Sequence, residues 1–167
     1  MAVVGTPDPS HPWRYRPRKK HVDLPAMTVQ ARLKMAVDAL APRKARSFTA
    51  NVLRAWGEQD LVDDAVLIVS ELTTNAFQYG RRQQDSTLQA IETIVLILEL
   101  RPDTVSVHIR DNSPILPSPR TSPEDQEGGR GLRIVAALAQ SWTATTVTGD
   151  GKQISAFLRR TSRNLPE

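Results

Sequence analysis

Proline is concentrated in two segments of this chain, and these segments limit where regular structure can form. Nine of the twelve prolines lie within residues 7–25 and 114–123. Proline lacks a backbone N–H and fixes its own φ angle, so it interrupts helices and central strands. The first segment also holds Arg, Lys and His and has the composition of a disordered tail. The second is predicted to be a long loop within the domain, and such loops are often lids or binding loops.

Length and charge exclude several classes of protein. The 167 residues suit one domain with an extension, and the formal net charge is +4. Residues 1–28 carry five basic and two acidic side chains. The remaining chain is therefore nearly neutral and lacks the basic face of a typical nucleic-acid-binding domain. The absence of cysteine excludes disulfides, thiolate metal sites and a cysteine nucleophile.

Apolar runs in the sequence are short. The run Ile94–Leu98, for example, has five residues, whereas a transmembrane helix needs about 20. The first residues also lack the apolar core of a signal peptide. We therefore expect a soluble, cytoplasmic protein that does not bind membranes.

Three helices are predicted from apolar periodicity. From Leu61 to Tyr79 the apolar residues recur every three or four positions, as in a helix that buries one stripe. An earlier helix has Pro42 in its first turn and ends at Gly57. A shorter helix is predicted for residues 131–140, after the proline-rich loop.

Strands are predicted on both sides of that loop. Residues 91–100 are rich in Ile, Val and Leu, and residues 105–110 alternate between apolar and polar side chains. A final hairpin joins residues 141–148 to residues 152–159 through a glycine-rich turn. A further strand near residues 32–40 is weakly signalled.

The predicted order is strand, helix, helix, strand, strand, loop, helix, strand, strand. Helices on one face of a mostly antiparallel mixed sheet make a two-layer α/β sandwich, an α+β fold. We expect one domain over residues 29–160. A disordered, basic, proline-rich tail over residues 1–28 precedes it, and a C-terminal tail over residues 161–167 follows it.

Glu71 and Asn75 form the first candidate site. They are four residues apart on the long helix, so their side chains lie over each other at the edge of the apolar stripe. A carboxamide oxygen is a hard ligand that Mg²⁺ accepts beside phosphate oxygens and water, and a neighbouring carboxylate can take a proton from a hydroxyl. The same spacing also suits an ordinary solvated polar face.

Asp111 closes the alternating strand, on the same face as Val105, Val107 and Ile109. An inward carboxylate is costly unless it is hydrogen-bonded, for example by the exocyclic amine of a purine. The alternative is an aspartate that caps the following turn. On the opposite face of the strand, His108 is expected to be solvated rather than catalytic.

A glycine cluster, Gly128–Leu132, stands between the loop and the short helix. Glycines let backbone amides approach an anion, and a helix start adds free N–H groups and a positive dipole end. Arg130 could add a bidentate charge or lie on the surface. The cluster outlines a phosphate site, although many such clusters only make turns. The usual P-loop and dinucleotide-binding glycine patterns are absent.

Together, three motifs resemble the N, G1 and G2 boxes of the histidine-kinase-like (GHKL, Bergerat-fold) ATPases. They are Glu71–Ala76, Asp111–Pro114 and Gly128–Leu132, and the resemblance covers roughly residues 40–160. The motifs are most similar to those of the bacterial anti-sigma-factor serine/threonine kinases and their stand-alone ATP-binding relatives. The resemblance implies the Bergerat ATP-binding fold, with ATP and Mg²⁺ as cofactors.

The resemblance also implies residue roles. Glu71 is similar to the general base, Asn75 to the Mg²⁺ ligand that also contacts the nucleotide, and Asp111 to the carboxylate that reads the adenine amine. Residues 114–127 resemble the lid. The further nucleotide-binding residues that it implies are Ser113, Gly128, Gly129, Arg130, Gly131 and Leu132.

Two departures from the wider superfamily concern the base-binding side. Ser113 and Pro114 stand where many members have glycines, although the most similar relatives share them. The last strand lacks an early threonine and offers Lys152, Gln153 and then Ser155. A contact to the adenine from that strand is therefore not predicted.

The resemblance implies a partner-switching kinase. Such a kinase phosphorylates an anti-anti-sigma antagonist and binds a sigma factor, and several members work as dimers, so a homodimer is one option. One alternative is a catalytically weak ATP-binding module that sequesters a transcription regulator. Another is a nucleic-acid binder acting through residues 14–20, against which the charge distribution argues.

Overall fold

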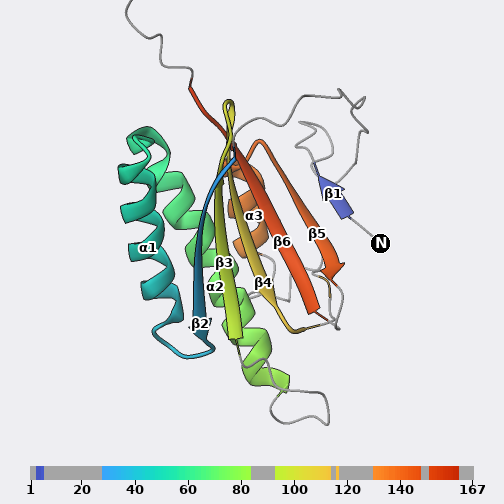
Figure 1. Ribbon diagram of the computed structural model, residues 1–167. Helices are drawn as coiled ribbons and strands as arrows, with labels where there is room; N and C mark the ends of the chain where they lie inside the picture. Colours follow the sequence, from blue (N-terminus) through green and yellow to red (C-terminus); the bar gives the residue numbers. More distant parts are fainter. Residues whose placement is uncertain are drawn as a thin grey trace, which may run out of the picture.

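In the part of the chain that the computed structural model describes, six strands form one sheet and three α-helices cover one of its faces (Figure 1). The described residues are 3–5, 28–83, 93–113, 116, 130–147 and 151–161. The predicted two-layer α/β sandwich is confirmed.

The strands lie in the order β1-β5-β6-β4-β3-β2 across the sheet. Each neighbouring pair is antiparallel, so the mostly antiparallel sheet is confirmed and its described pairs include no parallel one. The strands are β1 Val3–Gly5, β2 Val29–Ala36, β3 Thr93–Leu100, β4 Thr104–Asp111, β5 Ser141–Val147 and β6 Gly151–Arg159.

The helical layer follows the predicted periodicity. Its elements are α1 Ala41–Ala55, the 3-10 helix η1 Gln59–Leu61, α2 Val62–Gln83 and α3 Arg130–Leu138. At the end of α1, Gly57 has a φ of 78°. The Gly57 N–H bonds to the Arg54 carbonyl at 3.0 Å and the Glu58 N–H to the Leu53 carbonyl at 2.8 Å. These two bonds close the helix in the manner that a glycine at this position permits.

The core lies between the helices and the sheet. Ile68, Val69 and Leu72 of α2 are completely buried, and the inward residues Val107 and Ile109 of β4 are at most 1% exposed. Complete burial of one such side chain contributes about 1.5–3 kcal/mol. This burial holds α2 against the centre of the sheet and so fixes the position of its polar edge.

The two outer strands differ most from the sequence predictions. β2 spans Val29–Ala36 rather than residues 32–40, and most of its side chains are exposed, so it carries little apolar pattern. β1 pairs with β5, so the prediction of a tail without regular structure is wrong at Val3–Gly5. Residues 1–2 and 6–27 of that tail lie outside the described residues, as do residues 162–167 of the C-terminal tail.

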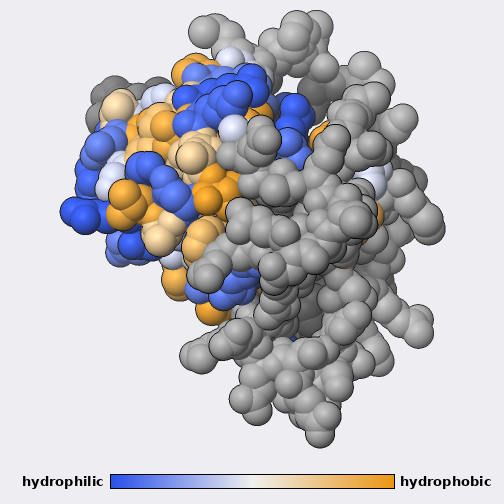
Figure 2. Space-filling model, turned by 90° about the horizontal axis from the view of Figure 1, so that it is seen from below, coloured by the Kyte–Doolittle hydropathy of each residue, from blue (hydrophilic) through white to orange (hydrophobic). Residues whose placement is uncertain are grey.

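The surface mixes apolar and polar residues. Seen from below, hydrophilic and hydrophobic residues alternate over the described part (Figure 2). The large hydrophobic residues exposed in that part are Val29, Leu40 and Leu67. None of the described helices combines the length and the apolar character that spanning a bilayer requires.

Candidate functional site

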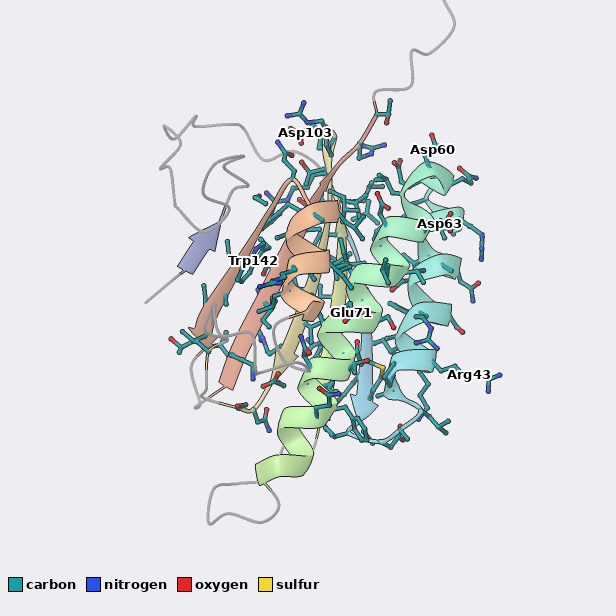
Figure 3. All side chains as sticks on the ribbon, turned by 180° about the vertical axis from the view of Figure 1, so that it is seen from behind. Arg43, Asp60, Asp63, Glu71, Asp103 and Trp142 are labelled. Carbon is teal, nitrogen blue, oxygen red and sulfur yellow. The ribbon has the colours of Figure 1, made fainter. Side chains whose placement is uncertain are left out.

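The polar pair on α2 lies against the first turn of α3. Glu71 is half-buried and Asn75 is 8% exposed, and Figure 3 shows Glu71 on α2 beside α3. A Cβ atom added at Gly131 would stand 2.8 Å from Glu71 Oε2 and 3.2 Å from Asn75 Nδ2. The structure therefore brings together three of the residues that the sequence analysis selected.

The close approach at Gly131 explains why a glycine stands there. Real Cβ atoms do not approach other heavy atoms to 2.8 Å, so a side chain would displace the Glu71 carboxylate. Without one, the first turn of α3 meets the polar pair directly. A helix start carries unsatisfied N–H groups and the positive end of the helix dipole. The arrangement places a helix start, which can bind an anion, directly beside an amide-carboxylate pair.

Asp111 is the last residue of β4 and faces the helical layer. Its side chain is 2% exposed, and Oδ1 accepts the Ser113 backbone N–H at 2.8 Å and Lys152 Nζ at 2.9 Å. Burial raises the pKa of Asp111 above its ordinary value, while the Lys152 ammonium and the Ser113 N–H lower it in part. The predicted inward direction of this carboxylate is confirmed, and it also caps its turn; the partners that the structure gives it are Ser113 and Lys152.

Lys152 is the functional candidate that the sequence analysis did not select. The antiparallel register pairs it with Asp111, and its side chain is 4% exposed. A signal was present, because Lys152 shares its strand face with Ile154, Ala156 and Leu158. A lysine on the apolar face of a strand predicts a buried partner.

The remaining predicted site residues divide into two groups. Ser113 is completely buried, and Leu132 is 5% exposed within the core. Arg130 begins α3, but its side chain is outside the described residues, as are Gly128 and Gly129. The predicted lid over residues 114–127 also lies outside them except at Leu116, which packs against the core.

His108 differs from its prediction. It lies on the face of the sheet opposite the helices, but it is only 9% exposed rather than solvated. Its Nδ1 lies 2.8 Å from Ser155 Oγ, and the Phe157 ring packs edge-on at 6.1 Å between centroids. Cross-strand neighbours thus cover the imidazole. Burial lowers its pKa, which Glu99 raises in part.

The donor set on α2 fits a phosphate-bound metal better than a protein-only metal site. The described residues hold no group of three or more His, Cys, Asp or Glu side chains that could bind a metal ion. Mg²⁺ commonly takes one or two protein oxygens and completes its shell with water and phosphate oxygens. Asn75, beside Glu71 and the start of α3, provides a donor of that kind.

Comparison with protein families agrees with this geometry. The model of the histidine kinase-like ATPase domain matches residues 35–157. The match runs from the end of β2 into β6 and includes the α2 pair, Asp111 and Lys152. No curated protein matches the chain.

Proposed function

Because this chain belongs to the histidine kinase-like ATPase family, we propose that it is an ATP-dependent serine/threonine protein kinase of the anti-sigma-factor, partner-switching type. Membership of the family implies ATP binding. The observation that carries the kinase proposal is the contact of Gly131 with both Glu71 and Asn75. That contact places a carboxylate, a carboxamide and a helix start at one point.

The residues around that point can divide the work of phosphoryl transfer. When bound, Mg-ATP would supply the phosphoryl group and the charge of the metal. Asn75 would hold Mg²⁺ through its amide oxygen, and the N–H groups at the start of α3 would hold phosphate oxygens. Phosphoryl transfer needs mainly positioning and electrostatic stabilisation, which these fixed groups can provide.

Glu71 would act on the accepting hydroxyl. Its carboxylate is half-buried next to Asn75 and Gly131. It would therefore lie close to the proposed Mg²⁺, which Asn75 rather than Glu71 would coordinate. There it would orient the serine of a partner protein or accept its proton. The partners in this proposal are an anti-anti-sigma antagonist, which is phosphorylated, and a sigma factor, which is bound, in the cytoplasm.

A phosphorylation assay with a charge-matched control tests the proposal. The protein is incubated with Mg²⁺, labelled ATP and candidate antagonist domains, and ATP affinity is measured by calorimetry. We expect Glu71→Gln to lower the transfer rate by about 10²–10⁴-fold, the usual contribution of a general base, and to leave ATP affinity within a few-fold. Asp63→Asn makes the same charge change at an exposed position of α2 and should keep the wild-type rate.

The two measurements separate the kinase from its alternative. ATP binding without transfer to any antagonist domain would contradict the kinase proposal and favour an ATP-binding module that sequesters a transcription regulator. Equal transfer rates for Glu71→Gln and the wild type would remove Glu71 from the mechanism. A failure to bind ATP would contradict both functions.

A further inference from the structure

A buried ion pair stands at the end of the otherwise apolar inner face of β4 and β6. Lys152 Nζ lies 2.9 Å from Asp111 Oδ1, and the side chains are 4% and 2% exposed. The other inward residues of the two strands are all apolar and at most 4% exposed. They are Val105, Val107 and Ile109 on β4 and Ile154, Ala156 and Leu158 on β6.

Stability alone does not explain this pair. Two charges lose their hydration on burial, and a buried ion pair replaced by apolar residues of similar volume often leaves the protein equally or more stable. The neighbouring positions show that this face accepts aliphatic side chains. Burial also raises the pKa of Asp111 despite the adjacent ammonium. Groups held in such an environment are candidates for ligand binding.

The local backbone holds the pair in a defined geometry. A Cβ at Gly151 would stand 2.6 Å from the Asp111 carbonyl oxygen, so only a glycine lets β6 begin this close to β4. On the other side, the Ser113 N–H holds the same Oδ1 at 2.8 Å. Asp111 is therefore an acceptor fixed from two directions, next to a fixed donor, Lys152. The contact of α2 with the inner faces of β4 and β6 places this pair on the side of the sheet that carries Glu71 and Asn75.

We propose that Lys152 reads the purine base by donating to the ring nitrogen N1, next to Asp111, which by the family resemblance accepts from the 6-amino group. This inference rests on ATP binding at the proposed site. On this edge, adenine presents the 6-amino donor beside the N1 acceptor. This order matches the protein, where the acceptor Asp111 lies beside the donor Lys152. A 6-oxopurine presents the reverse order and would leave the pair mismatched. Lys152 is then a specificity-determining residue contributed by β6, where the sequence departs from the superfamily pattern.

Nucleotide analogues test the contact on the whole chain. Calorimetry with Mg²⁺ compares ATP, 1-deaza-ATP, which has C–H in place of N1, and 7-deaza-ATP, which keeps N1. A hydrogen bond from a charged donor is worth about 1.5–3 kcal/mol, so wild-type protein should bind 1-deaza-ATP about 10- to 100-fold more weakly than ATP. 7-deaza-ATP should bind nearly as well as ATP. Inosine triphosphate, a 6-oxopurine, should bind more weakly than either.

Variants assign the effect to Lys152. Lys152→Met should bind ATP and 1-deaza-ATP with equal affinity, whereas Lys34→Met, at an exposed lysine of β2, should keep the wild-type ratio. If removal of the buried ammonium prevents folding, Lys152→Arg can be used instead, because it keeps the charge. The longer arginine side chain places its donors differently, so the ratio of ATP affinity to 1-deaza-ATP affinity should decrease.

Three results would overturn the inference, and they can be told apart. Equal affinity of the wild type for ATP and 1-deaza-ATP would show that Lys152 does not contact N1 and would leave the proposed kinase intact. If inosine triphosphate binds as tightly as ATP, the Asp111–Lys152 pair does not discriminate 6-aminopurines from 6-oxopurines. Wild-type protein that binds no purine nucleotide would remove the proposed function together with this inference.

Discussion

Replacing Gly131 by alanine should separate ligand binding from stability. The added Cβ would stand 2.8 Å from Glu71 Oε2 and 3.2 Å from Asn75 Nδ2, so both side chains must move by several tenths of an ångström. Both contacts are at the ends of flexible side chains. A shift of this kind costs about 0.5–1.5 kcal/mol. Alanine in place of glycine within α3 returns up to about 1 kcal/mol of helix stability.

The two effects on folding therefore nearly cancel, and we expect the melting temperature of Gly131→Ala to stay within about 5 °C of the wild type. Binding should respond differently, because the variant displaces the proposed metal ligand and the proposed base together. We expect the affinity for Mg-ATP to fall at least about tenfold.

Thermal unfolding and calorimetry on the same samples check this prediction. Ala137→Gly is the control, since it changes helix propensity at an exposed position of α3 without approaching α2. It should lower the melting temperature and leave ATP affinity unchanged. A Gly131→Ala protein with wild-type affinity and wild-type dependence on Mg²⁺ would refute the claim that the start of α3 and the polar pair of α2 make one site.

Three further predictions concern buried or half-buried polar groups. Lys152→Met should lower the free energy of unfolding by about 3–5 kcal/mol, because it leaves the Asp111 carboxylate buried without its cation. Adding Asp111→Asn should recover most of that loss in urea unfolding. A double variant as unstable as Lys152→Met would contradict the pairing. Burial lowers the pKa of His108 below 6.5, so its contribution to stability is complete above pH 6.5 and is lost as the pH falls through the lowered pKa. His108→Gln should flatten that acid limb in unfolding curves taken across pH, and an unchanged limb would assign the dependence to other groups. Arg160 donates to the carbonyls of Arg101 and Pro102 at 2.7 and 2.6 Å and to Glu58 Oε1 at 2.7 Å. Arg160→Met should therefore lower the free energy of unfolding by about 1–3 kcal/mol. An unchanged free energy of unfolding would show that these bonds only replace hydrogen bonds to water.

Prediction from the sequence succeeded where the signal is local. The buried stripe of α2 repeats every three or four residues, and β4 alternates with a period of two, so both elements were located from the pattern, although α2 continues to Gln83, beyond the predicted Tyr79. The alternation of β4 also predicted correctly that Asp111 faces the helical layer. β2 was located only roughly, because an edge strand with mostly exposed side chains carries little alternation. β1 was missed, because three residues cannot show a period.

Burial across strands could not be predicted in this way. His108 was assigned to solvent from the alternation of its own strand, but Ser155 and Phe157, far along the chain, cover it. The partner of Lys152 was not predicted, because Asp111 is 41 residues away in the sequence and only the register of β4 with β6 brings the two together. A shift of one residue in this register would place the two side chains on opposite faces of the sheet.

The sequence by itself determined the helices, the main strands and the residue types available for binding a nucleotide, because short-range periodicity and backbone preferences act within a few neighbouring residues. Only the tertiary structure decided which of those residues meet. The contact of Gly131 with Glu71 and Asn75 depends on how α3 packs on α2, and the Asp111–Lys152 pair depends on strand register. Both result from the packing of the whole core, whose free energy no local window of sequence contains.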